Sequence, residues 1–330
     1  MTKIESARQE YYEWCKAIGI ESTAALNEAL NAGKGIELIN LCEARQERKY
    51  AALASKIYLK RQTARIVMLA GPSSSGKTSS SLRIALQCKA LGLNPKVIEL
   101  DNYFVNRDQT PLDANGQLDF ECLGAMDVEF LNTQLNQLLA GEEIEVPTYD
   151  FKAGKRVFKG NTLKLEANDI LLMEGIHALN PDLTPGVNQE SIFKVYVSAL
   201  NTLFINETMK NSPADKRLLR RIVRDNRTRG MSPEDSILRW PSVRRGERKN
   251  IFPYEENADV VFTSSMLYDL PLLKYYAEPL LCGIAESSPA YEKAQKLLEV
   301  LSHIVALKPA EIAAVPPTSI MREFIGGQTL

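Results

Sequence analysis

The sequence predicts an α/β fold, in which a parallel β-sheet is flanked by helices and carries helical additions at both ends. From Arg65 onward, short apolar runs typical of strands alternate with stretches of helical periodicity. Some of these runs are apolar almost without interruption, as expected for strands buried on both faces of a parallel sheet. The chain before about residue 60 and after about Met266 has the composition of helices instead.

Three regions follow from this pattern. Residues 1–60, rich in Ala, Glu, Lys, Leu and Gln, are expected to form two or three helices. Residues 61–265 are expected to form the core, and residues 266–330 a helical extension packed on it. A helix should begin near Pro213 and end at Gly230. The candidate strands of the core are Ile66–Ala70, Lys96–Leu100, Asp169–Met173, Phe193–Val197 and Asp259–Thr263.

The composition is that of an ordinary globular protein with ample material for a core. Of 330 residues, 45% are hydrophobic and 25% are charged, and the formal net charge of −1 gives no overall attraction to nucleic acid or membranes. Five scattered cysteines without metal-type spacing are typical of reduced cytosolic thiols. The charged N-terminus lacks the apolar segment of a signal peptide, and no apolar stretch is long enough to span a membrane. We therefore expect a cytoplasmic location.

The first apolar run leads directly into the stretch Gly71–Thr78, which reads GPSSSGKT. Its pattern, G-x-x-x-x-G-K-[ST], is that of a P-loop, whose glycines let successive backbone N–H groups converge on phosphate oxygens. Lys77 should reach the β- and γ-phosphates, and the Thr78 hydroxyl should ligate Mg²⁺. An ordinary Gly/Ser-rich turn is the alternative, and the strand before and the helix after the stretch disfavour it. The predicted nucleotide-binding residues are Gly71, Ser73, Ser74, Ser75, Gly76, Lys77, Thr78 and Ser79.

Two acidic residues follow apolar strands of this P-loop NTPase-type sheet. Asp101 ends the run KVIELD, and Glu174 ends DILLME. In such folds the ligand lies at the carboxyl ends of the strands. A helix cap or a turn is the usual role of a lone carboxylate there, but two of them beside a phosphate loop favour chemistry. We assign Asp101 as the general base toward an acceptor hydroxyl and Glu174 as a Mg²⁺ ligand.

An arginine-rich segment lies further along the chain. Between Lys216 and Lys249 there are 12 Lys/Arg residues against 4 Asp/Glu. Arg217, Arg221 and Arg224 have the i, i+4, i+7 spacing of one helical face. Turned toward a triphosphate, this face would form a cationic lid over the transferring group. A solvated helix face and an RNA contact are the alternatives.

The order of these motifs resembles the uridine kinase–phosphoribulokinase family of P-loop kinases over roughly residues 62–265. The resemblance rests on the P-loop followed by ELDNYF, VPTYDFKAGKR, LLMEGIHAL and RRIVRDNRTRG. The later stretches WPSVRRGERKNIFPYEENADV, YAEPLL and IMREFIGG are similar to the long bacterial branch of uridine kinase-like proteins.

The resemblance implies a role for individual residues. It matches the family's base to Asp101, its Mg²⁺-associated glutamate to Glu174, and its lid arginines to Arg221, Arg224 and Arg229. The implied catalytic residues are Asp101, Lys77 and Arg224, and Arg221 and Arg229 join the nucleotide site. The implied acceptor-binding residues are Tyr103, Phe120, Glu121, Tyr149, Phe151, Arg156 and Arg221.

Two departures concern the acceptor. Uridine kinases usually carry a Phe-Asp-His-Pro-like segment near the acceptor ribose, whereas this chain has DFECLGAMD, with Cys122 and Leu123 in place of His-Pro. They also commonly place a histidine against the pyrimidine, near the position of Gly154 here. A polar base edge is discriminated strongly only when hydrogen-bond partners exist for it.

The predicted function is transfer of the γ-phosphoryl group of ATP or GTP, with Mg²⁺, to the primary hydroxyl of a uridine- or cytidine-like nucleoside. One alternative is a kinase of another small alcohol, such as a sugar phosphate or pentulose. The other is a nucleotide-dependent regulatory or RNA-binding protein without transfer activity. We expect a small-molecule acceptor, no nucleic-acid or membrane partner, and a chain compatible with a homo-oligomer.

Overall fold

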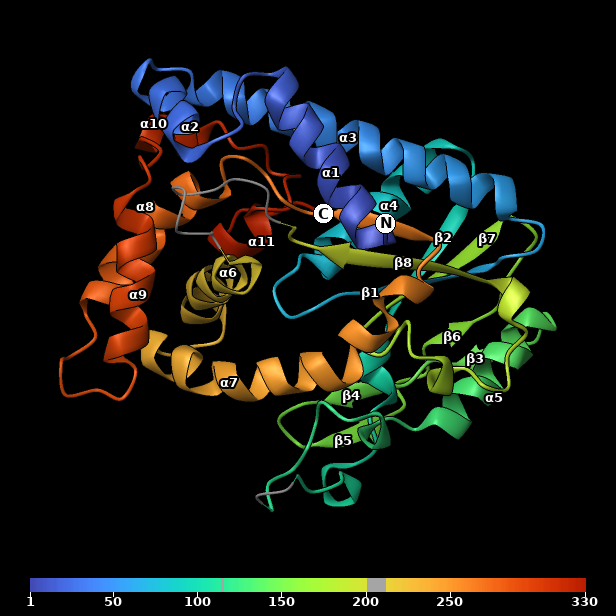
Figure 1. Ribbon diagram of the computed structural model, residues 1–330. Coiled ribbons are helices and arrows are strands. Elements are labelled where there is room, and N and C mark those ends of the chain that lie inside the picture. Colours follow the sequence, from blue (N-terminus) through green and yellow to red (C-terminus); the bar gives the residue numbers. More distant parts are fainter. Residues whose placement is uncertain (114–115, 201–211) are drawn as a thin grey trace.

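The computed structural model describes residues 1–113, 116–200 and 212–330, and its centre is a five-stranded parallel sheet (Figure 1). The spatial order of the strands is β2-β7-β1-β8-β9, and every neighbouring pair is parallel. The strands are β1 Ile66–Ala70, β2 Asn94–Glu99, β7 Asp169–Glu174, β8 Ile192–Ser198 and β9 Val260–Thr263. The predicted α/β fold with a parallel sheet flanked by helices is therefore confirmed.

Strand β1 explains why the apolar runs are continuous. Its alternate residues Ile66, Met68 and Ala70 pack into a cluster with helix α5 (Val128–Leu139). Val67 and Leu69 point to the other face, where they join a cluster with helices α3 (Gly35–Lys60) and α4 (Lys77–Ala90). Because side chains alternate along a strand, a strand covered on both faces needs apolar residues at every position.

The register of the sheet brings the strand ends to one edge. Leu69 lies opposite Glu174, and Glu174 lies opposite Glu99. The P-loop leaves β1 at this edge, and the 3₁₀ turn Leu100–Tyr103 leaves β2 beside it. Asp101 and Glu174, the two carboxylates predicted from the sequence, therefore lie at the carboxyl edge of the sheet, next to the P-loop.

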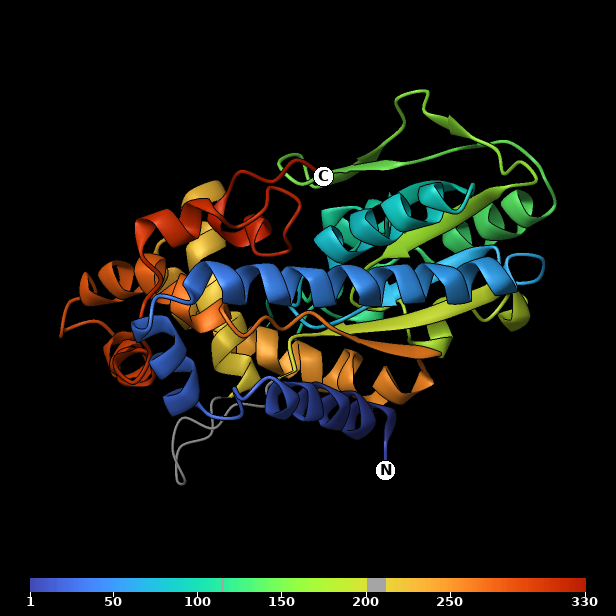
Figure 2. The same cartoon turned by 90° about the horizontal axis from the view of Figure 1, so that it is seen from above.

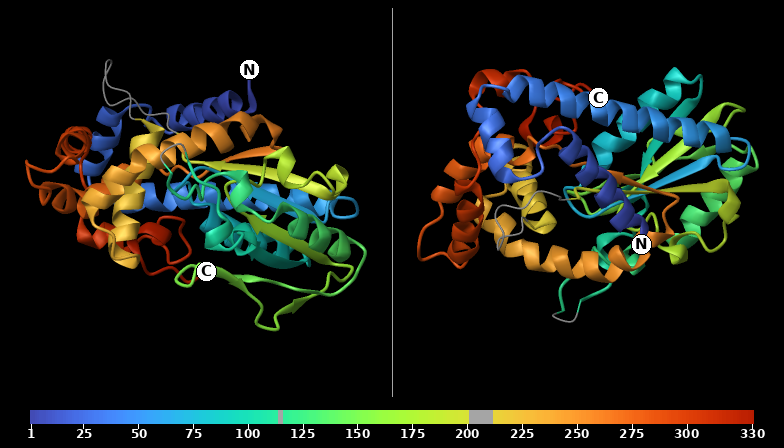
Figure 3. Two further views of the ribbon diagram at one scale, coloured as in Figure 1. Left: turned by 90° about the horizontal axis from the view of Figure 1, so that it is seen from below. Right: turned by 45° about the horizontal axis from the view of Figure 1, so that its top comes forward.

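Helix α3 links the sheet to the helical part of the molecule. The helices of the N-terminal part are α1 Lys3–Ala17, α2 Thr23–Asn31 and α3 Gly35–Lys60, and α4 Lys77–Ala90 follows the P-loop. Tyr50, Leu53 and Ile57 of α3 pack on the sheet, whereas Leu38 and Ile39 belong to the helical cluster. Figures 2 and 3 show this long blue helix running across both parts.

The C-terminal helices share one apolar core with the N-terminal ones. That core joins Tyr11 and Leu26 to Leu219, Leu273 and Phe324. Its helices that follow strand β8 in the chain are α6 Pro213–Thr228, α7 Pro233–Asn250, α8 Asp269–Cys282, α9 Tyr291–Ser302, α10 Pro309–Ala313 and α11 Arg322–Ile325. The helical additions expected at both ends are present, and they pack together.

Two small antiparallel pairs extend from the core beside α5. They are β3 (Ile144–Glu145) with β6 (Thr162–Leu163), and β4 (Thr148–Asp150) with β5 (Lys155–Val157). The β4–β5 pair projects at the lower edge of the view in Figure 1. Among the helices of the described residues, none combines the length and the apolar character needed to cross a membrane.

Candidate active site

The P-loop turns sharply into helix α4, which begins at Lys77. Gly76 has φ +84°, in the left-handed region, and a side chain there would meet Ile320. Ser74 also has a positive φ of 57°. These left-handed residues turn the chain directly into the helix N-terminus, where the helix dipole favours an anion. The loop therefore has the conformation that the motif predicts.

The side chains of Thr78 and Glu174 meet at the end of the P-loop. The Thr78 hydroxyl donates a hydrogen bond of 2.6 Å to Glu174 Oε1. Burial raises the pKa of the Glu174 carboxyl, while Lys77 and the Thr78 hydrogen bond lower it. Mg²⁺ at nucleotide sites is usually bound by one or two protein oxygens together with phosphates and waters. A hydroxyl and a carboxylate side by side fit that requirement.

Asp101 faces the same cavity from the end of β2. Burial, together with the negative charge of Glu174, raises the pKa of its carboxyl to about 7, although the positive charge of Lys77 opposes the shift. A carboxyl with a pKa near neutrality can accept a proton more readily than an ordinary aspartate.

A cavity of about 330 Å³ joins these groups. Besides the P-loop, it contains both predicted strand-end carboxylates, three arginines of α6 and its end, and apolar side chains. Its lining residues are Ser73, Ser74, Lys77, Thr78, Asp101, Phe104, Phe120, Glu121, Glu174, Gly175, Ile176, Arg221, Arg224, Arg229, Val243, Glu247 and Ile251.

One buried aspartate holds the lid arginines together. Asp225 is fully buried, and its carboxylate pairs with Arg221 at 3.2 Å, Arg224 at 2.8 Å and Arg229 at 3.5 Å. Arg221 also donates a hydrogen bond of 3.0 Å to Ser73 Oγ of the P-loop. Sequence reasoning did not assign Asp225, although it is the single acidic residue between Lys216 and Ser232.

Arg217 and Arg220 have a different role from the other arginines. Arg217 is 2% exposed, donates to the Ser73 carbonyl at 2.9 Å and pairs with Glu247. Arg220 is fully buried and pairs with Asp269 at 2.7 Å. Both arginines support the loop from the interior, so they do not contribute to an exposed basic surface.

Glu247 of α7 is a second functional residue that the sequence did not reveal. Its Oε1 accepts a hydrogen bond of 3.0 Å from the Ser73 backbone amide. Its Oε2 accepts one of 2.9 Å from Arg217 Nη2, and Arg244 pairs with it as well. A carboxylate thus anchors the first half of the P-loop to α7.

The predicted acceptor residues separate into two groups. Phe120, Glu121 and Arg221 line the cavity, and burial raises the pKa of the Glu121 carboxyl. Four others do not line it: Tyr103, Tyr149, Phe151 and Arg156. Tyr103 is buried and donates to Gln134, whereas Arg156 pairs with Asp127 at 2.8 Å. The rings of Tyr149 and Phe151 lie edge to face, 5.1 Å apart. Their roles toward the acceptor stay predictions.

Gly154 cannot be replaced by a larger residue without strain. It has φ +67°, and a Cβ there would lie 2.7 Å from Arg107 Nε. Arg107 is fixed in place because its amide donates to the Gly154 carbonyl at 2.8 Å and its Nη2 donates to the Phe151 carbonyl at 2.6 Å. A larger side chain at Gly154, near the position where uridine kinases commonly carry a histidine, would therefore be strained and would displace Arg107.

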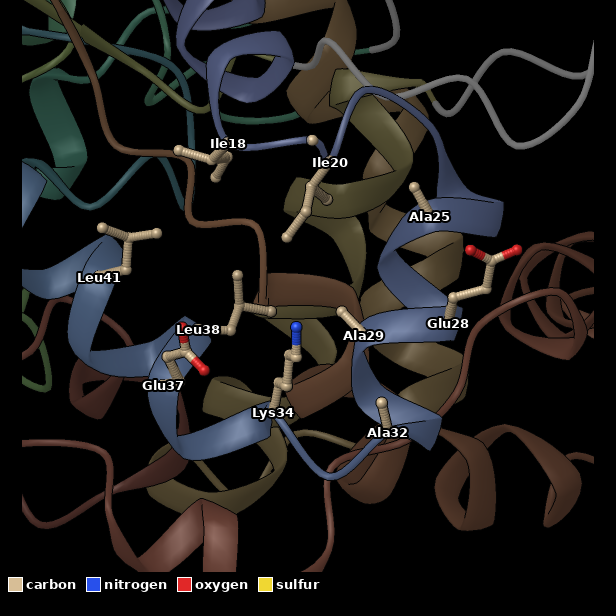
Figure 4. A pocket seen from close by; sticks show the side chains of 11 residues that line it. Ile18, Ile20, Ala25, Glu28, Ala29, Ala32, Lys34, Glu37, Leu38 and Leu41 are labelled. Carbon is tan, nitrogen blue, oxygen red and sulfur yellow. The ribbon is translucent and has the colours of Figure 1, made fainter.

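A further cavity, of about 380 Å³, lies between the connection that follows α1, helix α2 and the start of α3 (Figure 4). Its walls are mostly apolar, and the Lys34 side chain points into it beside Glu37. It has no phosphate loop and no converging set of polar groups. Across residues 1–113, 116–200 and 212–330, no cluster of three or more His, Cys, Asp or Glu side chains is arranged to hold a metal ion.

Comparison with known proteins assigns the core to a family. Residues 66–270 match the Phosphoribulokinase / Uridine kinase family. The chain belongs to this family. It is a uridine kinase-like phosphotransferase with an alcohol acceptor, so the predicted family and enzyme class are confirmed.

Two uridine kinases that are similar in sequence support this assignment. The uridine kinase of Macrococcus caseolyticus is 33% identical over 198 residues, which are 59% of this chain and 86% of that protein. The uridine kinase of Halobacterium salinarum is 29% identical over 194 residues, 58% of this chain and 77% of that one. Among solved structures, a possible uridine kinase from Bacillus stearothermophilus aligns at 21% identity with a TM-score of 0.43, covering 67% of this chain and 99% of that one.

Proposed function

We propose that this kinase transfers the γ-phosphoryl group of ATP or GTP to the primary hydroxyl of a nucleoside, uridine- or cytidine-like. The acceptor oxygen forms a new bond to the γ-phosphorus, and the bond from that phosphorus to the β–γ bridging oxygen breaks. The nucleoside diphosphate leaves with the electrons of that bond. Asp101 takes the proton of the acceptor hydroxyl.

One observation carries the proposal: Asp101, Lys77 and the Thr78–Glu174 pair line one cavity at the mouth of the P-loop. Phosphoryl transfer depends on positioning and on neutralising the charge of the transferred group. Lys77 and the three arginines held by Asp225 supply positive charge from two sides. Thr78 and Glu174 would hold Mg²⁺, which would supply further positive charge to neutralise the phosphates.

The identity of the acceptor is the finer part of the proposal. The uridine kinase relatives favour a nucleoside. The crowded Gly154 favours the other acceptor class, a sugar phosphate or pentulose, since it removes a side chain that uridine kinases use against the pyrimidine. We place the reaction in the cytoplasm, in keeping with five unbridged cysteines.

The experiment is an acceptor panel. The purified chain is incubated with Mg·ATP or Mg·GTP and with uridine, cytidine, adenosine, a pentulose or a sugar phosphate. Release of the nucleoside diphosphate is measured, and the product is identified by mass. Uridine and cytidine should give the highest kcat/KM, with the phosphate on the 5′ oxygen.

Two outcomes would contradict parts of the proposal. A sugar phosphate or pentulose preferred over every nucleoside would replace the acceptor and leave the transfer mechanism intact. Nucleotide binding without any phosphorylated product would remove the transfer reaction itself and would favour a regulatory protein.

A further inference from the structure

The C-terminal segment places a carboxylate on the first turn of helix α4. Glu323 Oε2 accepts a hydrogen bond of 2.6 Å from the Ser79 hydroxyl and lies 3.4 Å from the Ser79 amide nitrogen. Gln328 donates a hydrogen bond of 2.8 Å to the same hydroxyl. Glu323 Oε1 lies 3.8 Å from Arg224 Nη1, a guanidinium of the predicted lid.

The segment that carries Glu323 is fixed by packing on both sides. Phe324 is fully buried, and the guanidinium carbon of Arg220 lies 5.0 Å from the centre of the Phe324 ring. Arg227 of α6 donates to the carbonyls of Glu323 and Phe324, each at 3.3 Å. Ile320 lies against Gly76 of the P-loop. The position of Glu323 is therefore built into the fold and is tied to the helix that carries the lid arginines.

Ser79 lies in the part of a P-loop that faces a phosphate. The backbone amides of such a loop and of the following helical turn bind the α- and β-phosphates, and Lys77 reaches the β- and γ-phosphates. Ser79 is two residues beyond Lys77 along the helix, so its amide faces the phosphate nearest the nucleoside. The oxygens of Glu323 have the charge and the hydrogen-bond partners that non-bridging oxygens of that phosphate would have.

We propose that Glu323 acts as an internal phosphate mimic that the donor nucleotide must displace, so that it sets the affinity of the site for the donor. This inference rests on the proposed function only in requiring that a nucleotide binds the P-loop. Displacement of Glu323 also removes a partner from Arg224, which is then available to the donor phosphates. Binding of the donor and assembly of the lid are coupled through one carboxylate.

The energetic consequence follows from competition for one site. When a side chain of the protein occupies a ligand site, the ligand binds only those molecules in which the site is vacant. The apparent association constant is therefore the intrinsic constant multiplied by the vacant fraction. Removing the charge of Glu323 should raise that fraction, because hydrogen bonds to a charged acceptor are about twice as strong as neutral ones. Glu323→Gln keeps the shape and one acceptor oxygen but loses the charge.

The experiment measures binding directly, without an acceptor. Titration calorimetry with Mg·ADP and Mg·ATP compares the unmodified chain with Glu323→Gln and with Glu299→Gln, which changes an exposed glutamate of α9. We expect Glu323→Gln to bind both nucleotides about five- to tenfold more tightly. The control should match the unmodified chain. Gln328→Glu, which adds a second carboxylate beside Ser79, should weaken binding several-fold and tests the idea even if Glu323→Gln folds poorly.

The outcomes distinguish this inference from the proposed function. Unchanged or weaker nucleotide binding by Glu323→Gln, or unchanged binding by Gln328→Glu, would overturn the mimic while leaving the kinase intact. Absence of nucleotide binding in all four proteins, each shown to be folded by its thermal transition, would overturn the proposed function and the mimic with it.

Discussion

The phosphate side and the acceptor side of the cavity are built in different ways. On the phosphate side, buried ion pairs support the loop. Glu247 binds the Ser73 amide and Arg217, and Asp225 forms ion pairs with three arginines. On the acceptor side, Phe120 lines the cavity and is 40% exposed. The first side is organised before any ligand binds, whereas the second presents exposed aromatic surface.

This difference bears on how the two ligands are recognised. Preorganised charges stabilise a transferring phosphoryl group at little reorganisation cost, which suits a step that is common to a whole family. Exposed rings give contact area but little discrimination among polar groups, which requires placed hydrogen-bond partners. If the two sides act independently, a variant on one side should change only the binding or the reaction of the ligand on that side.

Asp101 lies where the two sides meet. Asp101→Asn should lower kcat by about 10³-fold, because the acceptor hydroxyl loses its base, and should leave the Kd for Mg·ADP within about twofold. In the unmodified chain, kcat/KM should fall as the pH drops below about 7, the pKa of this carboxyl. Steady-state kinetics and calorimetry check both statements.

Asp108→Asn is the matched control, since Asp108 is exposed and lies seven residues further along the chain. It should leave kcat unchanged. A near-normal rate for Asp101→Asn, or an equal loss in both variants, would show that Asp101 is not the base.

Glu247 tests the phosphate side alone. Glu247→Gln leaves Arg217 buried without its charged partner, and breaking a buried ion pair in this way costs about 3–5 kcal/mol of unfolding free energy. Because the same carboxylate binds the Ser73 amide, nucleotide affinity should fall as well. Denaturant unfolding and ADP titration measure the two effects. Glu234→Gln on the same helix, a partly exposed position, is the control. Equal stability of the two variants would contradict a supporting role for Glu247.

The ionisation of Asp101 should also affect stability. Its pKa is about 7 in the folded chain against an ordinary value of 3.8, so the folded state binds the proton more tightly than the unfolded state. Ionisation therefore destabilises the fold, by an amount that is absent below about pH 4 and complete above about pH 7. Asp101→Asn should have a higher Tm than the unmodified chain at pH 8, and the gap should narrow toward pH 5. A gap independent of pH would contradict the raised pKa.

Much of this architecture was predictable from the sequence. Each of the five candidate strands matches an observed strand to within two residues, and the helix expected near Pro213 begins there. Buried parallel strands require unbroken apolar runs, and the P-loop requires its glycines and lysine at fixed positions within eight residues. Such features depend on neighbours in the sequence, so pattern alone reveals them.

The side chains that support the P-loop from a distance were not predictable in this way. Glu247 reaches Ser73 across 174 positions, and Glu323 reaches Ser79 across 244. Both glutamates stand in stretches that are similar to uridine kinase-like proteins, but those stretches alone assign neither glutamate a role. Their roles come from the packing of α7 and of the C-terminal segment against the loop, which depends on the whole fold.

Two phenylalanines are predicted to contact the acceptor, and truncating either of them should have at most a small effect. Phe120 lines the cavity and Phe151 does not, although the resemblance to uridine kinases implies contact for both. Phe120→Ala should raise the KM for the acceptor by about two- to tenfold, the range expected for one aromatic contact, and should leave the Kd for Mg·ADP unchanged. Phe151→Ala, an equal truncation outside the cavity, should change neither constant. If Phe151→Ala instead had the larger effect on acceptor KM, the acceptor would lie against the β4–β5 pair, and the acceptor side would extend beyond the cavity that contains Asp101.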